Sequence, residues 1–256
     1  MYKLGLKLWS VNTDSYYNEA IRLYNKGIFD YIELYVVPNS LSELSKWKRM
    51  DIPFIIHSPH SAHGFNLAMA DKTKTNLEIY KQVRLFADEL NAQYIIFHGG
   101  TDGKIEETVK QLSSFHEPRV LIENKPYLPL PGNPNVKVCR GSTIDELKYI
   151  LNGVGCGLCL DIGHAVCSAN YQGKDPYAYI KELLCLKPKI FHLSDISDIR
   201  AVYDSHYHLG TGCLDIARLK REIFTVNSVI SIETIKDNKD NLNDFEKDVQ
   251  WLKSIG

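Results

Sequence analysis

The 256-residue sequence has no excess of either charge, because 30 lysines and arginines face 31 aspartates and glutamates. No global basic field therefore points to nucleic acid. No apolar run approaches the roughly 18 residues of a membrane helix, and the first residues, MYKLGLKLWSVNTD, lack the apolar stretch of a signal peptide. These absences predict a cytoplasmic protein without a membrane partner, and they leave the oligomeric state open.

Cysteine is scarce, with six residues that all lie between Cys139 and Cys213. Several stand in apolar, strand-like runs, which predicts buried free thiols in a reducing compartment rather than a disulfide framework. Cys156 and Cys159 form a C-x-x-C pattern, but no second pair follows. We interpret them as two core thiols, with a zinc or redox role as the less favoured alternative.

Length and patterning predict a single (β/α)₈ barrel over residues 1–256, since about 250 residues is the usual size of that fold. Apolar, β-rich runs alternate with helical patterns throughout, which is typical of parallel strands with crossover helices. The expected strands are Leu4–Trp9, Tyr31–Val37, Phe54–His57, Tyr94–His98, Val120–Glu123, Gly157–Asp161, Ile190–His192 and Val229–Glu233. The expected helices include Ser15–Lys26, Lys72–Leu90, Ile144–Leu151, Pro176–Leu186 and Leu242–Ile255.

Six consecutive strands end in a metal-ligand residue type: FIIHSPH, YIIFHGG, VLIENK, LCLDIGH, IFHLSD and ISIET. One such residue would usually be a cap or a satisfied polar group, but strand ends of this fold meet at one face, where the active site forms. So many carboxylates would repel one another unless imidazoles and divalent cations lay between them. Nitrogen and oxygen ligands without thiolate favour zinc, with manganese or iron as alternatives.

The loop after the seventh strand reads DSHYHLGTGCLD. Asp204 and His206 are two residues apart, so an extended segment would point both to one side and let them share an ion. Gly210 and Gly212 would let the backbone turn tightly.

Together these motifs resemble the endonuclease IV family of zinc-dependent abasic-site endonucleases (AP endonuclease 2 type), within the xylose isomerase-like TIM barrel superfamily. The resemblance spans nearly the whole chain and rests on HSP with FNLA, FHGG, LIEN, DIGH, HLSD, DSHYHLGTG and IET. The D-x-H-x-x-x-G-x-G element is the most specific of them.

The resemblance implies three divalent ions, and Mn²⁺ is an alternative to Zn²⁺. The first would be held by His57, His98 and Glu123, the second by Glu123, Asp161, His192 and Glu233, and the third by His164, Asp204 and His206. It further implies hydrolysis of a phosphodiester such as that at an abasic DNA site, with Glu123, Asp161 and Glu233 as the catalytic residues.

Asp195 would orient His192, while Lys125, His60, His63 and Asn66 would support the ligands or contact substrate.

The chain departs from the family pattern in its loops. Asn39 and Trp47 stand far apart after the second strand with no arginine between them, which puts a DNA-reading role in doubt. His60 replaces an aromatic residue, and SAH is inserted before GFNLA. FHGG replaces the usual His-Pro-Gly, and His116 and His208 are expected to be structural.

Two functions stay open at this stage. The first is a trinuclear phosphoesterase acting on abasic DNA, a smaller phosphodiester or a sugar phosphate. The second is a sugar or sugar-phosphate isomerase or epimerase that uses one ion held by Glu123, Asp161, His192 and Glu233, with the two glutamates moving protons. A non-catalytic binding barrel ranks last, because it leaves the ligand set without a purpose.

Overall fold

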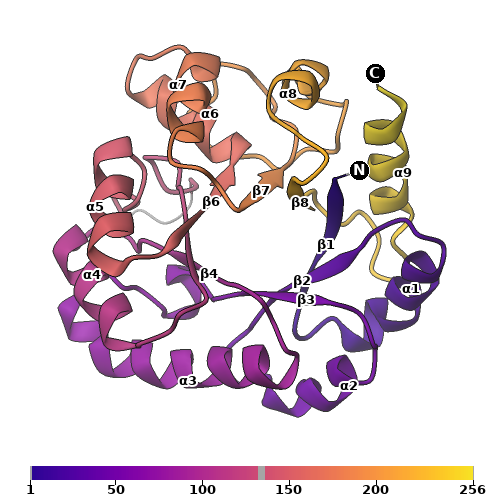
Figure 1. The fold of residues 1–256 in the computed structure, drawn as a ribbon, viewed down its shortest axis with the longest axis horizontal. Coiled ribbons are helices and arrows are strands. Elements are labelled where there is room, and N and C mark those ends of the chain that lie inside the picture. The colour runs from indigo at the N-terminus through magenta and orange to yellow at the C-terminus, as the bar shows by residue number, and fades with distance from the viewer. Residues whose placement is uncertain (1, 132–135, 256) are drawn as a thin grey trace.

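The eight expected strands form one parallel sheet that closes on itself in the computed structural model, which describes residues 2–131 and 136–255. The strands are β1 (Lys3–Trp9), β2 (Tyr31–Tyr35), β3 (Phe54–His57), β4 (Ile95–His98), β5 (Val120–Glu123), β6 (Gly157–Asp161), β7 (Ile190–Leu193) and β8 (Val229–Ile232). They pair in chain order, and β1 closes the ring by pairing with β8. Figure 1 looks into this ring, and the barrel prediction is confirmed.

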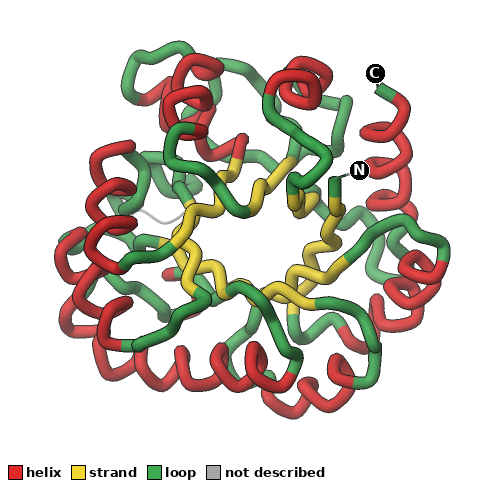
Figure 2. Tube along the Cα trace, in the orientation of Figure 1, coloured by secondary structure: helices red, strands yellow, loops and turns green. Residues whose placement is uncertain are grey.

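Helices surround the strands on the outside, as Figure 2 shows. The helices are α1 (Thr13–Asn25), α2 (Leu44–Lys48), α3 (Thr73–Glu89), α4 (Ile105–Ser114), α5 (Ile144–Val154), α6 (Ile162–Tyr171), α7 (Pro176–Leu184), α8 (Ile216–Glu222) and α9 (Asn243–Ser254). Within the described ranges, none of them combines the length and apolarity needed to cross a membrane.

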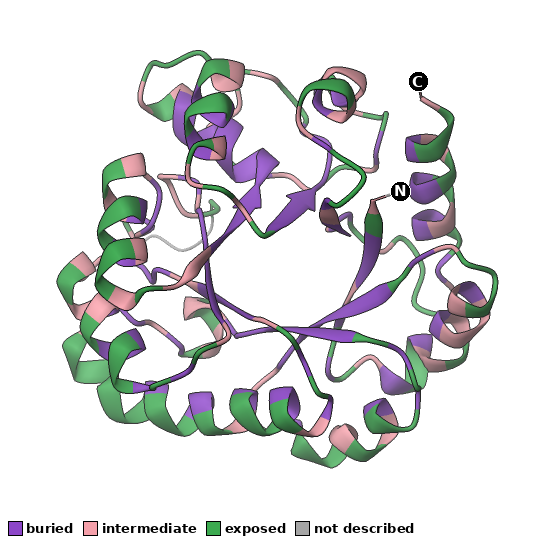
Figure 3. Ribbon diagram, in the orientation of Figure 1, coloured by how far each residue is buried: buried purple, intermediate pink, exposed green. Residues whose placement is uncertain are grey.

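The main core lies between the strands and the helices. Alternate strand residues such as Leu6, Ile32 and Ile122 belong to it and are fully buried. In Figure 3 the strands are almost entirely buried, whereas most helices have one buried and one exposed side; α6 is buried over nearly its whole length. Burial of these amphipathic helix faces against the strands is the main stabilising contribution to the fold.

A second, smaller core fills the barrel interior. Its members are the strand residues that alternate with the main core: Tyr31, Ile55, Ile96, Leu121, Cys159 and Ile190. Gly5 is required opposite Tyr31, because a Cβ there would lie 2.3 Å from the tyrosine ring. This apolar plug supports the polar residues that come two positions later on each strand.

The expected element boundaries agree with the structure to within a few residues. Helix α5 runs three residues beyond its expected end, to Val154. Strand β2 ends at Tyr35 rather than Val37, because the Val37 backbone amide donates to Ser10 Oγ and Pro38 has no amide hydrogen. The C-x-x-C residues face opposite sides of the sheet: Cys159 lies in the interior core, and Cys156 packs against the main core. Both are free thiols, as expected.

Candidate metal centre

The upper layer of the barrel interior is polar. Because side chains alternate along a strand, the residues two positions after the interior plug point to the same space, above it. They are Lys7, Glu33, His57, His98, Glu123, Asp161, His192 and Glu233. The strand ends therefore bring together the six predicted strand-end ligands, together with a lysine and a glutamate that the sequence analysis did not include.

Glu123 lies at the centre of this layer, and its two carboxylate oxygens face different groups. Oε2 is 2.9 Å from His57 Nε2 and 3.0 Å from His98 Nε2. Oε1 is 3.0 Å from His164 Nδ1. His57 Nδ1 donates to the Ser58 carbonyl at 2.7 Å, which leaves the lone pair of Nε2 available to a metal ion. A carboxylate with this arrangement can bridge two cations.

A second group forms around His192. Its Nδ1 lies 3.2 Å from Glu233 Oε1, 3.5 Å from Glu123 Oε2 and 3.9 Å from Asp161 Oδ2. Asp161 Oδ1 accepts from the His164 amide and caps α6, whereas Oδ2 has no hydrogen-bond partner among the described residues. Such orphaned, buried acceptors are costly unless a cation satisfies them, so the donor set fits a divalent ion.

The third group joins α6 to the loop after β7. Asp204 Oδ2 is 3.2 Å from His164 Nε2 and 2.6 Å from His206 Nε2. The three side chains place ligand atoms within 4.8 Å of one another. The segment is not extended as expected: His206 has a φ of 46°, and the Ser205 amide donates to Asp204 Oδ1.

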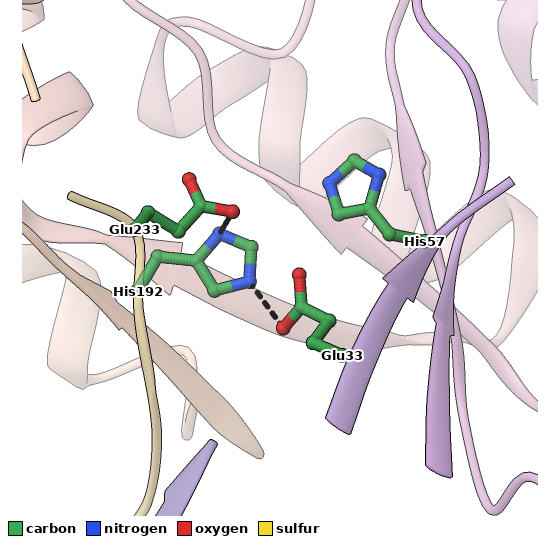
Figure 4. Close-up of side chains that lie close together, drawn as sticks. All are labelled: Glu33, His57, His192 and Glu233. Carbon is green, nitrogen blue, oxygen red and sulfur yellow. Dashed lines mark hydrogen bonds and ion pairs between the residues drawn. The ribbon is translucent and has the colours of Figure 1, made fainter. Parts of the chain in front are cut away.

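Asp195 holds this loop in place and does not orient His192. Its carboxylate accepts the amides of Ile196, Gly210, Gly212 and Leu214 at 2.9–3.0 Å. Gly212 is necessary there, because a Cβ would lie 2.2 Å from the Ile196 carbonyl oxygen and 2.5 Å from Asp195 Oδ1. The expected partner of His192 is replaced by Glu33, whose Oε2 lies 3.0 Å from His192 Nε2 (Figure 4).

The electrostatics of the layer show that it attracts positive charge. Burial raises the pKa of Glu233, but His192 and Lys7 outweigh it and lower that pKa to about 2. Burial lowers the pKa of His164, but Asp161 and other carboxylates raise it to about 10. The pKa of Asp161 is raised by burial and by the carboxylates around it. Without a metal ion, protons on His164 and His192, whose pKa values are raised despite burial, supply the missing cationic charge. His98 does not share this role, because burial lowers its pKa.

Lys7 and Glu33 were missed by the sequence analysis. Lys7 Nζ lies 2.7 Å from Glu33 Oε1 and makes a still closer contact with Glu233 Oε1. The sequence nevertheless contains an indication of both residues. The apolar runs KLGLKLW and YIELY each have a charged residue inside them, and such a residue cannot be buried without a partner. Both residues lie inside a strand rather than at its end.

The remaining predicted residues lie around the groups. Lys125 Nζ is 3.3 Å from His164 Nε2 and 3.5 Å from Glu123 Oε1. His63 Nδ1 lies 2.7 Å from Tyr35 Oη, and the His60 amide donates to the same hydroxyl at 3.0 Å.

Asn66 is used to join two loops. Its side-chain Nδ2 donates to the carbonyl and hydroxyl oxygens of Thr101 at 3.0 and 2.9 Å. His116 is exposed, and His208 pairs with Asp248 at 2.9 Å, so both lie outside the three groups.

A cavity of about 610 Å³ opens above the three groups. It is lined by Lys7, Trp9, Tyr35, His60, Lys125 and Lys236, among others. Burial lowers the pKa of the His60 imidazole to about 3, so this side chain is neutral at physiological pH. The volume falls in the range of small-molecule sites.

Comparisons with known proteins identify the fold family. A probable endonuclease 4 of Thermoplasma volcanium is 28% identical over 170 residues, which cover 60% of this chain. The aligned part spans only 57% of that relative. The crystal structure of endonuclease IV from Thermus thermophilus superposes with a TM-score of 0.72 at 18% identity, covering 98% of this chain and 99% of that one.

A D-tagatose 3-epimerase-like protein has nearly the same similarity in fold. Its TM-score is 0.71 at 20% identity, with 99% of this chain and 96% of that chain covered. At such identities the solved structures support the fold and do not separate the two chemistries. A family model described as xylose isomerase-like TIM barrel matches residues 27–255. The chain therefore belongs to the xylose isomerase-like TIM barrel family.

Proposed function

We propose that this protein is a metal-dependent phosphodiesterase of the endonuclease IV type that binds up to three divalent ions, with zinc favoured and manganese as an alternative. The observation that carries the proposal is the third group, His164, Asp204 and His206. An isomerase with one ion does not require it. Its connection to the other groups through Glu123 supports one continuous polymetal site.

Charge balance supports an anionic substrate. Five carboxylates face the site, namely Glu33, Glu123, Asp161, Asp204 and Glu233. Lys7, Lys125 and Lys236, which also lines the cavity, offset three of these charges, so two negative charges remain. Three divalent ions would convert that remainder into four positive charges, which favours a phosphate group, whereas one ion would leave the site neutral.

In this proposal Glu123 would be a ligand of two ions, and Asp161 and Glu233 would complete the second ion's ligands with His192. Bound divalent ions would supply Lewis acidity toward phosphate oxygens and lower the pKa of a water molecule. Lys125 would hold a phosphate oxygen, since its ammonium lies beside Glu123 at the cavity wall.

The loop after β2 favours a small phosphodiester or a phosphorylated sugar over duplex DNA. Trp47 is fully buried, and its indole nitrogen donates to the Ser10 carbonyl at 2.8 Å. The Asn39 backbone amide donates to Gln82 Oε1 at 2.7 Å. Trp47 therefore cannot reach DNA, and an abasic duplex is retained as the alternative substrate to be tested.

The second candidate function is a sugar or sugar-phosphate isomerase or epimerase. It is favoured by the cavity of about 610 Å³ and by the convergence of Glu123, Asp161, His192 and Glu233 around one point. In that case Glu123 and Glu233 would move protons at adjacent carbons.

Substrate trials on protein purified without chelator separate the two candidates. The substrates are bis(p-nitrophenyl) phosphate, a duplex containing an abasic site, and a panel of aldoses, ketoses and their phosphates. We expect hydrolysis of the small phosphodiester, its loss after chelation, and its return with zinc or manganese. His206→Ala should lose it, whereas His116→Asn, which changes an exposed histidine, should keep it.

Interconversion of sugars without hydrolysis of either phosphodiester would contradict the proposal and favour the isomerase. Incision of the abasic duplex would extend the proposal to DNA, and binding should then weaken steeply with salt. Hydrolysis that survives chelation would contradict the metal mechanism for any substrate.

A further inference from the structure

Glu33 is a buried carboxylate below the rim of the barrel, and it belongs to none of the three ligand groups of the metal centre. Its side chain is 0% exposed. Oε2 lies 3.0 Å from His192 Nε2 and also accepts from the Ser231 hydroxyl, while Oε1 is 2.7 Å from Lys7 Nζ. Figure 4 shows His192 between Glu33 on one side and Glu233 on the other.

The contact with Glu33 determines which nitrogen of His192 can bind a metal ion. An ionised carboxylate can only accept, so His192 Nε2 must carry the proton that faces it. The other nitrogen, Nδ1, then presents its lone pair to the space shared by Glu123, Asp161 and Glu233. Nδ1 is buried and lacks a hydrogen-bond partner among the described residues.

Glu33 is itself unsuited to be a ligand. Glu33, His57, His192 and Glu233 lie close enough together to hold an ion. However, the ammonium of Lys7 already lies between Glu33 and Glu233 and contacts both carboxylates. Lys7 is thus the cation of this group, and it offsets the cost of burying the Glu33 charge.

We propose that Glu33 is a positioning residue for the ion held by Glu123, Asp161, His192 and Glu233. It fixes the ring orientation and the tautomer of His192 so that Nδ1 binds the metal. This inference rests on the metal-binding part of the proposed function and holds equally for a phosphodiesterase and an isomerase, because both use this ion. It differs from the expectation that Asp195 performs this task.

The variant Glu33→Gln tests the proposal with little change of shape. The single carbonyl oxygen of glutamine is drawn to Lys7, which turns its NH₂ group toward His192 Nε2. That nitrogen must then accept, so the proton moves to Nδ1, where a metal ion has to displace it. We expect a loss of about 10–100-fold in the affinity of one ion, with the other ions unchanged.

The measurement is a calorimetric titration of the metal-free protein with Co²⁺, followed by the cobalt absorption spectrum and an elemental metal count. Glu117→Gln is the matched control, since Glu117 is also buried and ion-paired, to Arg119 at 2.7 Å, but precedes β5 at the opposite end of the barrel. It should bind Co²⁺ as the wild type does. Glu33→Asp keeps the carboxylate and should recover part of the affinity.

Long-range ¹H–¹⁵N spectra of zinc-loaded wild type provide a second test that needs no variant to fold. The proposal requires the His192 proton on Nε2, so a proton on Nδ1 overturns it. Unchanged Co²⁺ affinity in Glu33→Gln, or an equal loss in Glu117→Gln, also overturns it. If cobalt affinity falls as expected while no phosphodiester is hydrolysed, the proposed function fails and the role of Glu33 stands.

Discussion

Zinc should stabilise the protein less when the third group is removed, and the difference should equal the contribution of one bound ion. The double variant Asp204→Asn, His206→Ala deletes two of the three ligands within 4.8 Å of one another and leaves only His164. At a free zinc concentration 1,000 times the Kd, one site contributes about 4.1 kcal/mol. For a protein of this size, about 2–4 °C of Tm corresponds to 1 kcal/mol. The rise in Tm on adding zinc should therefore be about 8–16 °C smaller for the double variant than for the wild type.

The assay compares thermal unfolding with zinc and with chelator for the wild type and the double variant, alongside elemental analysis. The wild type should carry close to three ions and the variant one fewer. His116→Asn controls for the loss of a histidine and should match the wild type. Equal metal content and an equal zinc-induced rise in the double variant would refute the third site, and a single ion in the wild type would refute the polymetal centre.

Three further predictions concern single residues. Glu123→Gln should abolish nearly all activity while the metal-free protein stays folded, because an amide is a poor bridge between ions; activity within a few-fold of wild type would argue against the shared-ligand role. Gly212→Ala should cost about 1–3 kcal/mol in urea unfolding and weaken the third ion, since its Cβ would press on Asp195; unaltered stability would contradict this packing. Burial raises the pKa of Glu117, but hydrogen bonds from Arg119 outweigh burial and hold this pKa below its usual value. The ion pair therefore stabilises the fold fully above about pH 4.3, the usual glutamate pKa. This stabilisation disappears as the pH falls through the pKa that Glu117 has in the folded state. The stability gap between wild type and Glu117→Gln should therefore narrow in acid, and a constant gap would count against the ion pair.

The sequence by itself determined the barrel and most of the candidate ligands. Period-two apolar runs separated by helical patterns are local signals, and parallel strands in that order meet at one face. His57, Glu123 and Asp161 each end a predicted strand that the structure reproduces residue for residue. Their approach to one another needed no knowledge of distant contacts, only the rule that strand ends converge.

Only the tertiary structure decided which side chains support those ligands. Glu33 and His192 are 159 positions apart and meet across the closed barrel. Lys7 reaches Glu233 only because β1 pairs with β8. Asp195 stands near His192 in the sequence, yet it is directed to the loop amides that follow. Such contacts depend on ring closure and strand register, which bring together segments that no local pattern relates.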